Sequence, residues 1–209
     1  MSLLRIIKQQ DACLGIWKIE ESISQLLSLL DTPALYLQDL ERFSSESRKL
    51  EWLSVRALCH EMAGHDCNIA YHSSGKPYLP DGGYISISHT HGYVAVLYHP
   101  FFEVGVDIEQ YSERVKRVSS RFLCQDELLH IPQANETYAL LLHWSAKETI
   151  FKVMNATEVD FANHIHLKPF KVESEGEFQG EEYKSAMHQH YQIRYFTTAD
   201  FVLTWTIVD

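Results

Sequence analysis

The longest stretches of helical periodicity lie near the middle of each half of the chain. Leu50, Leu53, Leu58 and Met62 repeat at helical spacing, and Gly64 stands where a helix cap belongs. We therefore predict a helix over residues 47–64. Further helices are predicted over residues 23–30, 35–43, 112–129 and 137–155.

Alternation of apolar with polar or small residues predicts most of the remaining elements as strands. Val104, Val106 and Ile108 are β-branched and recur at every second position, as in a pleated strand. The predicted strands cover residues 69–72, 84–88, 93–98, 104–109, 165–167, 191–196 and 201–207, with one or two more within residues 3–18. The polar residues 173–182 are predicted to form a loop.

Landmarks of the first half recur in the second half at a fixed spacing. Trp52 and Trp144 are 92 residues apart, and so are the Lys-Pro pairs that begin at Lys76 and Lys168. Two unlike landmarks at one spacing favour a duplicated unit.

The end of each predicted half carries a further match. Residues 93–96 resemble residues 201–204 at a spacing of 108, which an insertion in the second half explains. Pro100 cannot continue a strand ladder, so it marks a boundary. We predict an α+β fold that is a pseudo-twofold duplication of an α/β unit, residues 1–100 and 101–209, each half a long helix packed on an antiparallel sheet. Ligand sites commonly lie between such domains.

Composition and charge exclude several classes of protein. With 45% hydrophobic residues the chain is globular, and a formal charge of -10 argues against binding to nucleic acid or to an anionic membrane. Four cysteines without C-x-x-C spacing indicate reduced thiols in a cytoplasmic protein. Charged residues interrupt every early apolar run, so we expect no signal peptide and no membrane span. Three His-x-His pairs lack further ligands at suitable spacing, and zinc is not expected.

Candidate chemistry lies on the predicted strand 104–109 and the predicted helix 137–155. Asp107 and Glu109 point to the same side of the strand, about 6–7 Å apart. Trp144, Glu148 and Lys152 lie on one face of the helix, since they are spaced by four residues. Carboxylate oxygens suit Mg²⁺, which keeps substrate phosphates as further ligands, so the set predicts phosphate chemistry.

Each of these patterns also has a plain structural interpretation. A D-x-E strand often shows only a solvated face, and a helix with Lys and Glu is usually a salt-bridged surface. Their joint occurrence is more specific than either alone.

The paired sequences G-V-D-I-E and W-S-A-K-E-T-I-F-K, which start at Gly105 and Trp144, resemble a known signature. It is that of the 4'-phosphopantetheinyl transferases of the surfactin-synthetase type, G-x-D-x-E followed by W-x-x-K-E-x-x-x-K. Residues 75–80 and 85–90 resemble two further motifs of that family, in the family's order. The resemblance runs from about residue 45 to the end of the chain.

The resemblance implies transfer of 4'-phosphopantetheine from coenzyme A to a serine of an apo acyl or peptidyl carrier protein, releasing adenosine 3',5'-bisphosphate. Asp107, Glu109 and Glu148 would hold Mg²⁺, with Mn²⁺ as an alternative. Glu148 would also accept the serine proton, and Lys152 would hold a phosphate or protonate the leaving oxygen. Fatty-acid, polyketide and peptide assembly all remain open as the pathway.

Other residues are candidates for binding coenzyme A. By their positions in the family's motifs, Lys76, Ser88 and His89 would bind its phosphates. A G-K-P sequence without the neighbouring motif would be interpreted as an ordinary turn with a solvated lysine. Arg48 and Arg56 are candidates for the 3'-phosphate or adenine end, and Lys147 has a weaker claim. Some relatives carry a lysine-rich stretch near residue 30, but residues 32–40 have no basic residue here.

A basic cluster suggests where an acidic carrier would dock. It consists of Arg114, Lys116, Arg117 and Arg121, which otherwise form a solvated helix face. A non-catalytic module that binds coenzyme A or a carrier protein is the alternative function, and a Mg²⁺-dependent phosphodiesterase acting on pyrophosphate linkages is a third. The internal duplication favours a monomer.

Overall fold

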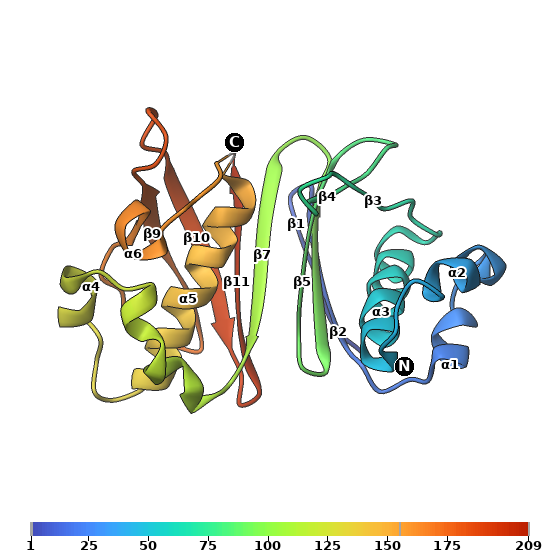
Figure 1. Cartoon of the computed structure of the whole chain (residues 1–209), viewed down its shortest axis with the longest axis horizontal. Coiled ribbons are helices and arrows are strands. Elements are labelled where there is room, and N and C mark those ends of the chain that lie inside the picture. The colour runs from blue at the N-terminus through green and yellow to red at the C-terminus, as the bar shows by residue number, and fades with distance from the viewer. Residues whose placement is uncertain (1, 155, 209) are drawn as a thin grey trace. The chain divides into compact units, whose positions relative to one another are not determined.

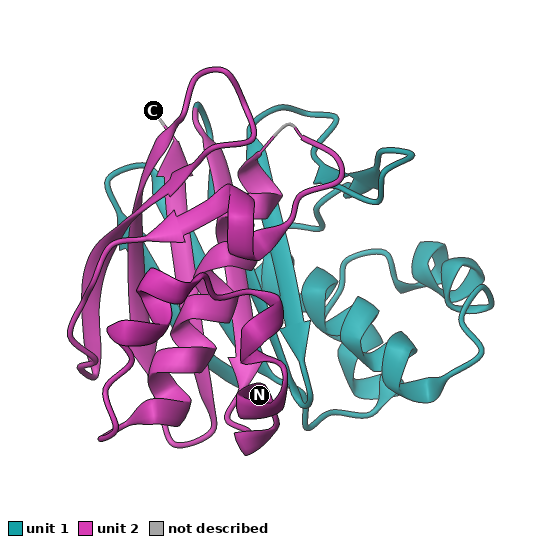
Figure 2. Ribbon diagram, turned by 60° about the vertical axis from the view of Figure 1, so that its left-hand side comes forward, with its two compact units in different colours: residues 1–101 teal, residues 102–209 magenta. Residues whose placement is uncertain are grey.

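The structure is a computed structural model that describes residues 2–154 and 156–208. The chain divides into two compact units, residues 1–101 and residues 102–209 (Figure 2). Each unit combines helices with antiparallel sheet, so the predicted α+β class is confirmed.

The first unit is built on a four-stranded antiparallel sheet of order β1-β2-β6-β5. Its strands are β1 (Leu3–Gln9), β2 (Ala12–Lys18), β5 (Tyr84–Thr90) and β6 (Tyr93–His99). A separate small hairpin joins β3 (Ala70–Tyr71) to β4 (Pro77–Tyr78). The helices are α1 (Ile23–Leu27), α2 (Pro33–Leu40) and α3 (Glu46–Ala63).

The long helix α3 begins and ends at residues that suit helix ends. The Ser45 side chain accepts a hydrogen bond from the Arg48 amide, and Gly64 closes the helix in the left-handed region at φ 81°. Leu53 and Leu58 are fully buried in one core with Val94 and Val96 of the sheet. The predicted helix over residues 47–64 is therefore confirmed within one residue.

The second unit is built on a five-stranded antiparallel sheet of order β7-β11-β10-β9-β8. Its strands are β7 (Glu103–Gln110), β8 (Ile165–Leu167), β9 (Glu175–Glu182), β10 (His190–Thr197) and β11 (Phe201–Val208). Figure 1 shows α5 (Glu136–Val153) lying along this sheet, where it packs mainly on β7 and β11. The predicted helix over residues 137–155 is confirmed up to Val153; residue 155 lies outside the described residues.

The predicted single helix over residues 112–129 is wrong. The segment forms two 3-10 helices and a short α-helix instead: η1 (Glu113–Arg117), η2 (Ser119–Arg121) and α4 (Gln125–Leu129). Phe122 and Leu123 are consecutive and both buried between η2 and α4, where the chain turns inward rather than continuing as one surface helix.

The predicted loop over residues 173–182 is also wrong, because most of it is strand β9. The inward positions are Phe178, Gly180 and Glu182, and Phe178 stacks on Phe170 with ring centroids 3.9 Å apart. Glu182 is buried because it accepts hydrogen bonds from the backbone amides of Lys184 and Ser185. The polar composition concealed an alternation in which a glycine and a satisfied carboxylate take core positions.

The other predicted helices and strands are present, with ends shifted by a few residues. The short helix α6 (Phe161–His164) was not predicted. Within the described residues, no helix combines the length and apolar character that crossing a membrane requires.

Candidate functional site

Strand β7 presents Asp107 and Glu109 to helix α5. Gly105 shares their face of the strand, and a Cβ at Gly105 would overlap the Thr149 carbonyl oxygen of α5. Glycine is therefore what allows the strand and the helix to approach this closely. The sequence prediction that both carboxylates share one side of the strand agrees with this geometry.

Replacing Gly105 with alanine tests this close approach. The added methyl must push α5 away from β7, so we expect the free energy of unfolding to fall by about 1–3 kcal/mol in chemical denaturation. Gly180→Ala is the matched control in the same sheet, since the nearest atoms to its Cβ would be the side-chain ends of Ile150 and Leu167. An equal or larger loss at Gly180 would contradict the explanation.

Helix α5 turns a half-buried stripe towards these carboxylates. Trp144, Glu148 and Lys152 are partly exposed, whereas residues 145–147 and 149–150 between them are buried. A stripe with an indole, a carboxylate and an ammonium is therefore open to solvent on an otherwise buried stretch of helix.

Direct contacts join the stripe to the strand. Trp144 Nε1 donates to Glu109 Oε1 at 2.8 Å. Lys152 Nζ donates to Asp107 Oδ1 at 2.9 Å and to the Val106 carbonyl at 2.8 Å. Among the described residues, Glu148 has no hydrogen-bond or ion-pair partner for its carboxylate. The stripe thus anchors the two carboxylates of β7 and leaves Glu148 available.

The pKa values show that negative charge is in excess at this site. Burial, followed by the charge of Asp107, raises the pKa of Glu109 to about 7. The same two causes raise the pKa of Glu148 to about 7, and Lys152 opposes the shift only in part. A divalent cation would offset the remaining repulsion.

The donor set fits Mg²⁺, because all three groups supply hard carboxylate oxygens from β7 and α5. The carboxylate oxygens of these three residues do not all lie within 4.8 Å of one another.

A hydroxyl network, which the sequence analysis missed, fixes α5 on the sheet. Thr204 of β11 lies opposite Asp107 in the strand register. Its Oγ1 is 2.9 Å from Ser145 Oγ and 2.7 Å from Thr149 Oγ1. Ser145 and Thr149 are small hydroxyl residues at buried helix positions within the sequence motif. They are the signal that could have indicated this network.

Lys147 does not belong to this site, which corrects its predicted role in binding coenzyme A. Its side chain is fully buried, and its Nζ lies 2.7 Å from Glu127 Oε2. Nζ also donates to the carbonyls of Phe122, Phe161 and Ile165 at 2.7–3.0 Å. An ammonium surrounded by buried acceptors has no proton left for a phosphate, so Lys147 is a structural residue.

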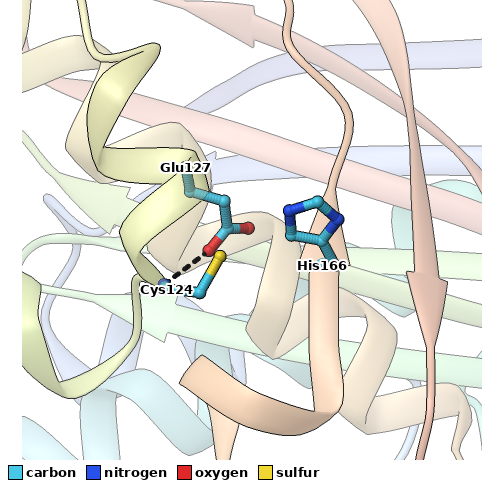
Figure 3. Close-up of side chains that lie close together, drawn as sticks. All are labelled: Cys124, Glu127 and His166. Atoms are coloured by element: carbon cyan, nitrogen blue, oxygen red, sulfur yellow. Dashed lines mark hydrogen bonds between the residues drawn. The ribbon is translucent and has the colours of Figure 1, made fainter.

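The contacts of Glu127 also decide whether a nearby cluster of side chains could bind a metal ion. The potential ligand atoms of Cys124, Glu127 and His166 lie within 4.8 Å of one another (Figure 3). Glu127 already accepts from the Cys124 amide, from Lys147 and from the Leu167 amide. A cation here would face a buried ammonium, so the cluster does not fit a metal.

The first unit holds four of the residues predicted to bind coenzyme A: Arg48, Lys76, Ser88 and His89. Arg48 Nη1 donates to His89 Nε2 at 2.9 Å, so the structure brings these two residues together. Ser88 is buried and, as the neighbour of His89 on β5, points to the opposite face of the sheet. Lys76 is partly buried just before β4.

Arg56 does not fit its predicted contact with the 3'-phosphate or adenine of coenzyme A. Its guanidinium carbon lies 3.7 Å above the Trp52 ring, and its Nη1 donates to the Trp52 carbonyl at 3.2 Å. The residue is only 4% exposed. Arg56 therefore stabilises the core beside α3 through a cation–π contact.

Residues 103–206 match the model of the 4'-phosphopantetheinyl transferase superfamily. The match extends from β7 to β11 and includes Asp107, Glu109, Glu148 and Lys152. No curated protein matches the chain.

Proposed function

We propose that the chain transfers 4'-phosphopantetheine from coenzyme A to a serine of an apo acyl or peptidyl carrier protein, in a Mg²⁺-dependent reaction that releases adenosine 3',5'-bisphosphate. The match over residues 103–206 supports the class of reaction, and the four sequence motifs support the surfactin-synthetase type. One observation carries the proposal: the Glu148 carboxylate, which has no hydrogen-bond or ion-pair partner among the described residues, is close enough to the ion-paired Asp107 and Lys152 for their charges to shift its pKa.

Glu148 is the proposed general base. The serine oxygen attacks the β-phosphorus of coenzyme A, the bond to the bridging oxygen breaks, and the serine proton passes to Glu148. Mg²⁺ held by Asp107, Glu109 and Glu148 would supply the positive charge that stabilises the diphosphate.

Trp144 and Lys152 position the acidic groups for this reaction. Trp144 fixes one oxygen of Glu109, and Lys152 fixes Asp107. Two of the three Nζ protons of Lys152 are donated to Asp107 and Val106. The third proton is therefore the one we assign to the phosphate or the leaving oxygen.

For coenzyme A we retain Lys76, Ser88 and His89 as proposed phosphate contacts, and Arg48 as a proposed contact of the 3'-phosphate or adenine end. Arg48 and His89 form the best supported pair, because they touch and are both exposed. The Glu51 carboxylate, 2.6 Å from Arg48, helps to fix the position of the guanidinium.

The carrier protein is proposed to dock on η1 and η2. Arg114, Arg117 and Arg121 are exposed there, beside the exposed apolar residue Val118. Lys116 is instead paired with Glu113 and Glu136 at 3.0 Å. Three exposed arginines on an acidic chain would steer an acidic partner to this surface.

Mass spectrometry of a carrier protein tests the proposed function. Purified chain, coenzyme A and Mg²⁺ are incubated with a panel of apo acyl and peptidyl carriers. We expect the mass of one phosphopantetheine arm to be added to at least one carrier, at its serine. A carrier whose serine is replaced by alanine is the control. No addition to any carrier would overturn the proposal.

A non-catalytic module that binds coenzyme A or a carrier is the alternative function. A binder has no need to bring carboxylates together at the cost of raised pKa values. The observations at Glu109 and Glu148 therefore favour the enzyme.

The raised pKa values predict how stability depends on pH and Mg²⁺. Between the unfolded pKa of 4.5 and the folded pKa of about 7, the folded protein holds more protons at Glu109 and Glu148, so its stability falls as pH rises. Each shift corresponds to roughly 3 kcal/mol.

Without divalent ions we expect a lower melting temperature at pH 8 than at pH 6. Adding Mg²⁺ should raise the melting temperature more at pH 8 than at pH 6. Glu109→Gln is the control, which should weaken both effects; an equal Mg²⁺ gain at both pH values would contradict the prediction.

We further propose that the two units arose by pseudo-twofold duplication. The two sheets share a strand order, β2-β6-β5 in the first unit and β7-β11-β10 in the second. In both orders, the first strand precedes the long helix of its unit, the middle strand is the last strand of that unit, and the third is the next-to-last strand. Gly15 of β2 and Gly105 of β7 both face the long helix of their own unit. A shared strand order with a glycine at corresponding places supports the duplication.

A further inference from the structure

A cavity of about 460 Å³ lies inside the first unit, and none of the residues proposed above for catalysis or binding lines it. This volume falls in the range of small-molecule sites. Ile85, Val96 and other apolar side chains form part of its wall. Three of the four cysteines of the chain, Cys13, Cys59 and Cys67, line the same space. A cavity that gathers thiols gives a small reagent access to them.

Cys59 and Cys67 are in contact at this cavity. Cys59 is buried on α3, and Cys67 follows the helix in the segment that leads to β3 and is partly exposed. Cys67 Sγ lies 3.7 Å from the carbonyl oxygen of Cys59 and 3.7 Å from that of His65. Both are free thiols in the structure.

The two thiols differ in reactivity. The interaction with Cys59 lowers the pKa of Cys67 to about 7 against the opposing effect of burial, and His65 and His60 act in the same direction as Cys59. The interaction with Cys67, together with burial, raises the pKa of Cys59. Burial also raises the pKa of Cys13. Cys67 is thus the thiol with the largest thiolate fraction among the three at neutral pH.

We propose that Cys59 and Cys67 form a thiol–disulfide exchange site for low-molecular-weight disulfides, with Cys67 as the attacking thiol and Cys59 as the resolving one. The Cys67 thiolate attacks a sulfur of the disulfide RSSR, forms a mixed disulfide and releases RS⁻. Cys59 then loses its proton to solvent and attacks the Cys67 sulfur, which releases the second RS⁻. Two protein thiols are oxidised, and one RSSR is reduced to two RSH.

The product would link α3 to the segment before β3 across eight positions of sequence. The cavity would accommodate the R group in the mixed disulfide. Neither step involves Asp107, Glu109 or Glu148, so the site is independent of the proposed transfer activity.

Reaction of the full chain with oxidised glutathione at pH 7 tests the proposal. After an acid quench and alkylation of the remaining thiols, peptide mass spectrometry is expected to find a Cys59–Cys67 disulfide. Cys59→Ser should instead accumulate glutathione on Cys67, because the resolving thiol is missing. Cys67→Ser should form neither product. Cys13→Ser and Cys124→Ser are matched controls that should behave as the parent chain does.

Alkylation rates give a second measurement that needs no substitution. Cys67 should react with iodoacetamide at least about three-fold faster than Cys13 at pH 7, with an inflection in its rate near that pH. Circular dichroism confirms that each variant is folded, and Cys59→Ala replaces Cys59→Ser if the latter is not. A stable glutathione adduct in the parent chain, or preferential reaction at Cys13, would overturn the proposal.

Discussion

Replacing Glu148 with glutamine is expected to lower the rate of phosphopantetheine transfer by at least about 100-fold, with little change in the affinity for coenzyme A. The loss follows from removing a general base, which typically contributes about 10²–10⁴ in rate. Glutamine keeps the size of the side chain but accepts no proton. The measurements are the rate of carrier modification and the dissociation constant of coenzyme A by calorimetry.

The same substitution should not destabilise the metal-free protein. Glu148 has no partner to lose among the described residues, and its pKa of about 7 reflects burial and repulsion by Asp107. Removing that charge should leave the melting temperature at pH 8 unchanged or higher, so lost turnover would not reflect unfolding. Glu175→Gln, at an exposed position of β9, is the control and should retain activity. Unchanged transfer by Glu148→Gln would remove Glu148 from the mechanism.

The parts of the site that the sequence predicts are those governed by periodicity. A spacing of two places Asp107 and Glu109 on one side of a strand, and a spacing of four aligns Trp144, Glu148 and Lys152 on a helix. Local geometry fixes both arrangements. The close packing of the helix on the strand then depends on Gly105, which is part of the same motif.

The predictions that failed depend on contacts between residues distant in sequence. Lys147 is adjacent to Glu148 in the chain, yet its partner Glu127 lies 20 residues earlier. Arg56 was expected at a ligand because it is basic, but Trp52 and the fold around α3 bury its guanidinium. Charge alone does not indicate whether a side chain meets solvent or a buried acceptor.

The segments assigned to the wrong secondary structure have the same cause. Residues 112–129 look helical in composition, but the chain turns so that Phe122 offers its carbonyl oxygen to Lys147. Residues 173–182 look like a loop in composition, but most of them form β9, which pairs with β10 and packs Phe178 on Tyr195. In both cases a tertiary interaction outweighs local propensity.

Replacing Lys147 with methionine is expected to lower the free energy of unfolding by about 3–5 kcal/mol, the usual cost of removing one partner of a buried ion pair. Nζ of Lys147 joins Glu127 of α4 to carbonyl groups of Phe122, Phe161 and Ile165. Methionine keeps the apolar stem but leaves the buried Glu127 carboxylate without its ammonium partner and three carbonyls without the donor they share. Chemical denaturation measures the loss.

Two comparisons separate this structural role from the binding role that the motif suggested. Lys152→Met, one turn beyond Glu148 and partly exposed, should lose transfer activity with a much smaller loss of stability. Adding Glu127→Gln to Lys147→Met should recover part of the stability, because the unpaired buried charge is removed. If Lys147→Met instead weakened coenzyme A binding and left unfolding unchanged, the ammonium would have to reach the ligand. The acceptors around Lys147 Nζ all belong to the second unit and enclose the ammonium. We therefore expect the adjacent lysine and glutamate of this motif to have separate roles. Lys147 holds the elements around α5 together, and Glu148 takes part in the reaction.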